Sequence, residues 1–237
     1  MKTVEKIANR SGKNRDLTGF PSAYRNYSDI YHKFSLAEDR KGLILKEIKR
    51  LCSSQKTVLL DIGCGTGRYI VSLASSCKKV IGIDPIESQL EYALNQTSNL
   101  RNVVCILGDG ENIPLSNESI NVVIITWVTF RNPSKALKEI LRVTNKNGVI
   151  IRVSPYKIDD LTSLFPSLNL ATIKRNNDLF ESFGFKCRYR KISIDFRSTA
   201  DAKRVVSTVI GCDENRVKKN LLYHNVVIQK YKKTKFQ

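Results

Sequence analysis

Short apolar runs alternate with amphipathic segments through the first two thirds of the chain. The apolar runs have strand length, so we expect buried strands at residues 58–62, 79–84, 102–109, 121–128 and 149–154. Between them, apolar positions recur at helical spacing over residues 68–76, 88–96 and 134–143. Strands that alternate with helices in this way predict a parallel sheet with helices on both faces.

The flanking segments follow other patterns. Ahead of the alternation, apolar residues near one face predict a helix over residues 36–51, and Asn-Lys-Asn-Gly at 145–148 predicts a turn. Beyond residue 155 the pattern predicts helices at 177–185 and 200–211 and strands at 186–196 and 224–231. The two late strands fall outside the strand–helix–strand rhythm, so we expect them to form an antiparallel edge.

Length and composition fit one globular domain with additions, since the chain has 237 residues of which 41% are hydrophobic. No apolar run approaches the about 20 residues that span a membrane, and the charged N-terminus does not resemble a signal peptide. The six cysteines include no C-x-x-C pair and only two histidines are present, so we expect no metal site. Free thiols are typical of a reducing cytoplasm, which is the expected location.

The formal net charge of +18 is unevenly distributed. Residues 1–60 carry 13 basic and 6 acidic side chains, residues 61–150 carry 9 and 8, and residues 151–237 carry 18 and 8. Basic flanks of this kind suit an anionic partner such as nucleic acid. A solvated surface or a general compositional bias explains the same charge equally well, because net charge reports only non-specific attraction.

The most informative stretch is VLLDIGCGTGRYIV, at residues 58–71. Its glycines, Gly63, Gly65 and Gly67, stand between a predicted strand and a predicted helix, a position that usually holds a ligand. The spacing is G-x-G-x-G, with Arg68 where the third glycine of a dinucleotide loop would stand, and no Walker sequence is present. Asp61 before the loop would repel phosphate and suits a ligand with positive charge.

S-adenosylmethionine meets these requirements, because it carries an ammonium, a sulfonium, a ribose diol and an adenine but no phosphate. Asp84 ends the second predicted strand, where an acid can accept both ribose hydroxyls. Asp109 ends the third, where it can accept a hydrogen bond from the adenine amino group. Three apolar side chains near these positions could pack on the base: Ile62, Ile86 and Ile113.

The chain at this point resembles the class I S-adenosylmethionine-dependent methyltransferases, and most closely their type 11 group. The resemblance rests on D-I-G-C-G-T-G, G-I-D-P, L-G-D-G-E-N-I-P-L and A-L-K-E-I-L-R-V followed by N-G-V-I-I, in order over residues 55–155. It implies a doubly wound, Rossmann-like α/β fold with a seven-stranded mixed sheet whose last strand is antiparallel. It also implies S-adenosylmethionine as cofactor, with these binding residues: Asp61, Gly63, Gly65, Gly67, Asp84, Pro85, Asp109 and Gly110. Asp61 and Gly63 would approach the methionine end, and the Gly110 amide would hold adenine together with Asp109.

The resemblance also gives a domain organisation. Residues 1–35 form a basic lead, in which Tyr24, Tyr27 and Tyr31 could fold over the cofactor as a flap or simply pack on the surface. Residues 36–237 form a single methyltransferase domain. Its cofactor-binding core spans about 55–155, and its acceptor side about 156–237.

The sequence departs from the family on the acceptor side. The fourth strand begins Ile-Asn where relatives have Phe-Asp, and no histidine pair follows it. We therefore assign no catalytic residue; three residues are pocket candidates only: Trp127, Arg131 and Tyr156. His32 and His224 are expected to be structural, and Cys64 to be a small packing residue.

The favoured function is methyl transfer to a small molecule, by in-line displacement at the sulfonium methyl. An RNA acceptor is the alternative, supported by the basic flanks and by Lys186, Arg188 and Arg190 on one predicted strand, although such charges also protect edge strands. A non-catalytic regulator that binds S-adenosylmethionine is a further alternative, and an NAD-binding oxidoreductase is weaker. The sequence leaves the acceptor and the oligomeric state open.

Overall fold

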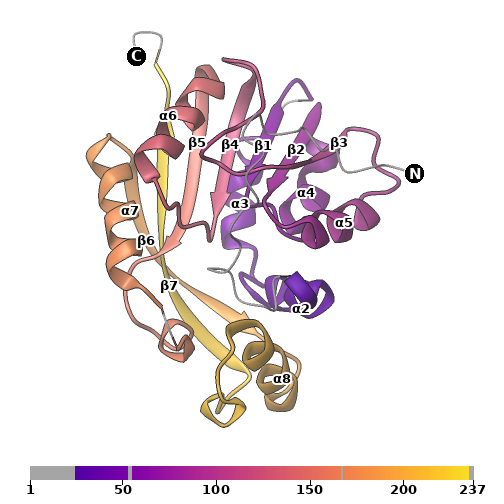
Figure 1. Ribbon diagram of the computed structural model, residues 1–237, viewed down its shortest axis with the longest axis vertical. Coiled ribbons are helices and arrows are strands. Elements are labelled where there is room, and N and C mark those ends of the chain that lie inside the picture. The colour runs from indigo at the N-terminus through magenta and orange to yellow at the C-terminus, as the bar shows by residue number, and fades with distance from the viewer. Residues whose placement is uncertain (1–24, 53–54, 167, 235–237) are drawn as a thin grey trace.

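The computed structural model describes residues 25–52, 55–166 and 168–234, which form a seven-stranded sheet in the order β3-β2-β1-β4-β5-β7-β6 (Figure 1). The strands are β1 (Val58–Ile62), β2 (Lys79–Asp84), β3 (Val103–Leu107), β4 (Ile120–Thr126), β5 (Thr144–Pro155), β6 (Lys186–Asp195) and β7 (Leu221–Lys232). Strands β1 to β5 are parallel, and β7 runs antiparallel between β5 and β6. The expected mixed sheet with an antiparallel last strand is confirmed.

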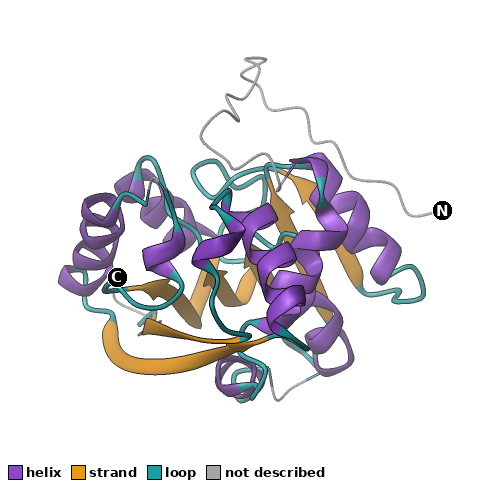
Figure 2. Ribbon diagram, turned by 90° about the horizontal axis from the view of Figure 1, so that it is seen from below, coloured by secondary structure: helices purple, strands orange, loops and turns teal. Residues whose placement is uncertain are grey.

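Helices cover both faces of this sheet (Figure 2). On one face lie α3 (Leu43–Lys49), α4 (Arg68–Leu73) and α5 (Glu87–Gln96), and on the other α6 (Pro133–Val143) and α7 (Leu170–Ser182). Each layer encloses a core of Ile, Val and Leu side chains from alternate strand positions, which is how a parallel sheet is buried on both sides. No helix in the described ranges is long and apolar enough to cross a membrane.

A third core lies beyond the end of the parallel strands. There α2 (Ser28–Ala37) packs on α8 (Thr199–Ile210), and both contact the extended ends of β6 and β7 (Figure 1). Phe34 of α2, Val205 of α8 and Ile194 of β6 are all buried in this cluster. The N-terminal helix is thereby fixed to the C-terminal part of the chain.

The helix expected over residues 36–51 is wrong, because the chain breaks it between α2 and α3. Asp39 and Gly42 both have positive φ, 51° and 66°, so the backbone turns there. The Asp39 carboxylate then accepts hydrogen bonds from the amides of Leu43, Ile44 and Leu45 at 2.7, 2.8 and 3.2 Å. A carboxylate that accepts hydrogen bonds from the unpaired amides of a helix N-terminus stabilises the beginning of a helix. A second helix therefore begins here, and the first does not continue.

Two other boundaries differ from expectation. The turn at residues 145–148 lies within β5, where the pairing shifts from Ile120–Thr144 to Val122–Val149 and leaves extra residues on β5 as a bulge. The helix expected at 177–185 begins earlier, at Leu170, because the Asn169 side chain caps it by accepting the amide hydrogen of Thr172 at 2.9 Å.

Gly67→Ala should destabilise the fold more than Gly42→Ala. Both glycines have positive φ, so alanine costs about 1–2 kcal/mol at either position. A Cβ at Gly42 meets nothing within 4 Å, whereas one at Gly67 lies 3.0 Å from Cβ of Ala93 in α5, which adds about 1–3 kcal/mol of overpacking. Urea denaturation of both variants measures the difference, and equal losses would contradict the close packing of the glycine loop on α5.

Candidate functional site

A cavity of about 320 Å³ opens at the carboxyl ends of the parallel strands. Such crevices are where open α/β sheets bind ligands. Six of the eight residues expected to bind a cofactor line it: Gly63, Gly65, Asp84, Pro85, Asp109 and Gly110. The other two, Asp61 and Gly67, are not among its lining residues.

The glycine loop is held by the end of β2. The amides of Gly63 and Cys64 donate to the Ile83 carbonyl at 2.8 and 3.1 Å. The Asp84 carboxylate accepts the Gly65 amide on one oxygen and the Ile86 amide on the other, each at 2.9 Å. The carboxylate that shapes the glycine loop therefore lies in the wall of the cavity.

Asp61 lies beneath the loop and is 1% exposed. Within the described residues neither of its carboxyl oxygens has a hydrogen-bond partner. Burial raises the pKa of Asp61 to about 8; the charge of Arg68 opposes this rise and that of Asp84 adds to it. A positive charge in the loop above would favour ionisation of Asp61, and the ionised carboxylate would in turn favour that positive charge.

Arg68 stands where a dinucleotide loop has its third glycine, and its side chain makes contacts that a glycine cannot make. Its guanidinium donates to the backbone carbonyls of Ser35 and Glu38 and lies 3.6 Å from the Glu38 carboxylate. It also donates to the hydroxyl of Tyr69 at 2.6 Å. The side chain therefore ties the glycine loop to the end of α2.

This tie places Tyr31 over the cavity. Tyr31 lines it, and a Cβ added to Gly65 would lie 3.1 Å from the Tyr31 ring. Tyr27 is 49% exposed, and Tyr24 lies outside the described residues. Of the two flap tyrosines that the structure describes, Tyr31 is thus the one that lines the cavity.

The far wall comes from the segment after β3. Oδ1 of Asp109 accepts the Glu111 amide at 2.9 Å, and a Cβ on Gly110 would meet the Phe130 ring at 2.7 Å, so that backbone approaches the cavity closely. Three acidic side chains, Asp84, Asp109 and Glu111, and one basic side chain, Arg131, line the cavity. This balance favours a cationic ligand over a phosphate.

One residue expected to pack on the adenine and one pocket candidate lie away from this cavity. Ile62 and Ile86 line the cavity, but Ile113 is buried in the α6–α7 core and does not. Trp127 and Arg131 line the cavity as expected of pocket candidates. Tyr156 does not: it lines a separate groove, where its ring contacts that of Tyr189.

A second cavity, of about 140 Å³, adjoins the first and shares three lining residues with it: Tyr31, Trp127 and Thr129. Trp127 has a positive φ of 64°, a backbone strain that large non-glycine residues rarely adopt and that concentrates at functional sites. Most other walls are apolar, including Phe34, Leu161, Phe165, Leu168 and Ile173.

Two titratable residues of this second cavity, Glu38 and His224, were missed as functional residues by sequence reasoning. They lie far apart in the chain and belong to no motif. His224 was expected to be structural, and only the placement of β7 beside β5 brings it to the cavity. Only one indication was available from the sequence: His224 stands in a strand of alternating pattern, at a position whose side chain is expected to face inward.

A family model for a methyltransferase domain matches residues 53–230. The chain belongs to this methyltransferase family. The match spans most of the chain, including the part beyond residue 155 that the motifs did not cover, and it confirms the resemblance drawn from those motifs.

Individual relatives are distant. The chain is 27% identical over 148 residues to a demethylmenaquinone methyltransferase of Staphylococcus aureus, covering 60% of this chain and 61% of that one. It is 34% identical over 117 residues to an uncharacterised 37.1 kDa protein of a Streptomyces fradiae transposon, covering 47% and 34%. The chain thus spans from a third to three fifths of the length of these relatives.

A solved SAM-dependent methyltransferase from Aquifex aeolicus shares the fold, with a TM-score of 0.56 and 17% identity. The similarity covers 85% of this chain and 98% of that one.

Asp61→Asn should change how the stability of the methyltransferase depends on pH. Between about pH 4 and pH 8 the unfolded Asp61 is ionised and the folded one is protonated, because its folded pKa is raised. Unfolding then releases a proton, so wild-type stability falls as pH rises, by at most about 1.4 kcal/mol per pH unit from this group, and levels off above pH 8. The variant lacks this contribution.

Urea denaturation at pH 5, 6, 7 and 8 measures the effect as the difference between variant and wild type. Glu91→Gln is the matched control, because Glu91 is an exposed carboxylate on α5. Parallel curves for Asp61→Asn and wild type would show that Asp61 is already ionised at neutral pH.

Proposed function

We propose that this protein uses S-adenosylmethionine to methylate a small, largely apolar molecule in the cytoplasm. One observation supports this most directly: a cavity with acidic walls, built on the glycine loop, meets an apolar cavity at Trp127. The first suits a cationic nucleoside and the second an apolar acceptor. The free state of all six cysteines agrees with a reducing compartment.

The described residues fit S-adenosylmethionine. Asp61 is buried without a hydrogen-bond partner below the loop, and the charged side chains of the cavity lining are mostly acidic, which suits a ligand with an ammonium and a sulfonium. We assign Asp84 to the ribose hydroxyls and Asp109, with the Gly110 amide, to the adenine. Gly63 and Gly65 leave room for the methionine end, and the apolar side chains Ile62, Pro85 and Ile86 pack on the nucleoside.

When bound, the cofactor supplies a methyl group activated by the positive sulfur. The contribution of the chain is then mainly to align the acceptor with that methyl, an effect that reaches several kcal/mol. Tyr31 and Trp127 line both cavities and so stand at the passage where the two ligands would meet. They would also exclude water, which keeps the reactive cofactor from hydrolysis.

A small acceptor follows from the second cavity, which is too small and too apolar to receive a folded RNA element. The Staphylococcus aureus relative, whose name denotes a quinone-type substrate, also favours an apolar molecule. RNA remains the alternative, because Lys186, Arg188 and Arg190 are exposed on β6, the edge strand. Tyr189 beside them is 51% exposed.

Calorimetric titration should detect S-adenosylmethionine but not NAD. Asp84→Ala should weaken binding at least about tenfold, because the variant loses the hydroxyl acceptor and also frees the Gly65 amide that shapes the loop. Glu91→Gln removes one exposed charge from α5 and should bind like wild type. Normal binding by Asp84→Ala, or tighter binding of NAD, would refute this site assignment.

Transfer of tritiated methyl from S-adenosylmethionine into a cell extract identifies the acceptor class. We expect label in the small-molecule fraction, unchanged by RNase and little affected by salt. RNase-sensitive label whose yield falls steeply with salt would instead show phosphate contacts and an RNA acceptor. Cofactor binding without incorporation into any fraction would favour the non-catalytic regulator.

The double variant Arg188→Gln, Arg190→Gln separates the two acceptors further. Both side chains are exposed on the edge strand and line neither of the two adjoining cavities. For a small acceptor the rate should stay within about twofold of wild type, whereas for RNA each lost phosphate contact should reduce the salt slope by about one.

A further inference from the structure

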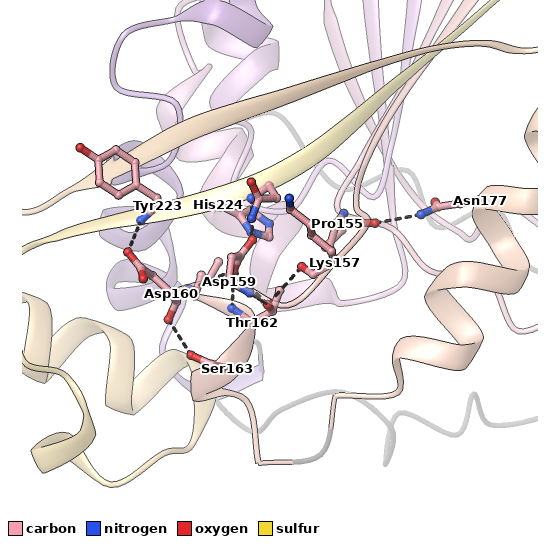
Figure 3. A network of polar contacts seen from close by, with 11 residues as sticks. Pro155, Lys157, Asp159, Asp160, Thr162, Ser163, Asn177, Tyr223 and His224 are labelled. Atoms are coloured by element: carbon pink, nitrogen blue, oxygen red, sulfur yellow. Dashed lines mark hydrogen bonds and ion pairs between the residues drawn. The ribbon is translucent and has the colours of Figure 1, made fainter.

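The second cavity contains a histidine–aspartate pair. Nδ1 of His224 in β7 lies 2.8 Å from Oδ2 of Asp159, which follows β5, and both side chains are almost completely buried, at 2% and 3% exposure (Figure 3). His224 lines the cavity, and its ring lies 5.2 Å from that of Trp127, centroid to centroid. The pair therefore stands at the passage to the cofactor cavity.

Asp159 is built to stay ionised. Its carboxylate accepts backbone amide hydrogens from Leu161 and Thr162 on one oxygen and from Asn225 on the other, at 3.1, 2.9 and 2.5 Å. Burial alone would raise the pKa of Asp159, but the His224 ring and these amides outweigh burial and hold the pKa below its usual range. A permanent carboxylate faces Nδ1.

This contact fixes the tautomer of His224. An ionised carboxylate can only accept, so Nδ1 carries the hydrogen and the lone pair of the neutral ring lies on Nε2. No hydrogen bond of Nε2 occurs within the described residues. The ring that lines the cavity therefore carries one proton-accepting nitrogen that the fold does not use.

Two further ionisable side chains lie near the His224 ring. Glu38, from the end of α2, lies near enough to interact with His224, and Arg68 of α4 lies behind it at 3.6 Å. Burial raises the pKa of Glu38, against the opposing effects of Arg68 and His224. Tyr31 is the remaining titratable side chain of the cavity wall.

We propose that His224 is the general base of this site and that the acceptor is an apolar, aromatic molecule with an acidic hydroxyl, bound in the second cavity. The inference rests on the proposed function. The acceptor oxygen forms a bond to the methyl carbon with its own electron pair while the sulfur–carbon bond breaks and its electrons stay on sulfur. The hydroxyl proton passes to Nε2, Asp159 stabilises the resulting imidazolium, and the proton then leaves to water.

The walls support this acceptor class. Phe34, Phe165 and Ile173 give aromatic and aliphatic surface, so a flat apolar ring can bind there. Its hydroxyl would then face the polar residues of the same cavity, of which His224 is the one with a free acceptor nitrogen. A charged or strongly polar acceptor would lose hydration that this cavity does not replace.

The test uses 4-nitrophenol as the probe, because its phenolate absorbs visible light and its phenol does not. S-adenosylhomocysteine fills the cofactor cavity, since its uncharged sulfur does not itself stabilise the phenolate. In wild type the bound probe should ionise about 1–3 pH units below free 4-nitrophenol, because the imidazolium favours the charged form. His224→Asn should return ionisation to the pH of the free probe, and Asp159→Asn should give a smaller shift than wild type.

Tyr223→Phe is the matched control, because Tyr223 precedes His224 on β7 and its ring lies under Lys191, away from the cavity. It should keep the wild-type shift. Calorimetry with S-adenosylhomocysteine shows whether each variant is folded. Failure of wild type to bind S-adenosylhomocysteine would overturn the proposed function. If S-adenosylhomocysteine binds, three results with 4-nitrophenol would overturn the base assignment alone. The probe fails to bind, it binds as the neutral phenol, or it ionises equally in wild type and His224→Asn.

Discussion

The carboxylate of Asp84 holds the Gly65 amide on one oxygen and the Ile86 amide on the other, and the cavity takes its form from these two bonds. They join the glycine loop after β1 to the end of β2, so two neighbouring strands present their carboxyl ends as one surface. The three loop glycines, at alternate positions, have positive φ and follow that path without strain. Because Asp84 also lines the cavity, the group that shapes the loop lies where a ligand would bind.

Arg68 extends this arrangement to the N-terminal helix. Its bonds to the end of α2 place Tyr31 over the loop and Glu38 in the second cavity. The packing of α2 on α8 then joins that helix to β6 and β7, which carry the acceptor side. The two cavities meet at Trp127 because elements from both ends of the chain converge on the carboxyl end of β4.

The sequence predicts well those elements that depend on a local pattern or on a short motif. Buried strands and the G-x-G-x-G loop follow from short patterns, and six of the eight expected cofactor residues line one cavity. The helix over 36–51 failed because Asp39 caps a new helix, which hydrophobic spacing does not reveal. Asn121, a departure from the family, bonds the Val58 amide at the opposite end of the sheet and so does not bear on the chemistry. His224 could not be found, since its role depends on pairing between distant strands.

The most direct measurement is a crystal structure of the protein with S-adenosylhomocysteine. We expect the adenosine between Asp84 and Asp109, the amino-acid end over the glycine loop, and the sulfur beside Trp127, facing the second cavity. A ligand bound elsewhere would contradict the account, as would a sulfur that faces away from that cavity. Either result would separate the cofactor from the apolar cavity that Trp127 and His224 line.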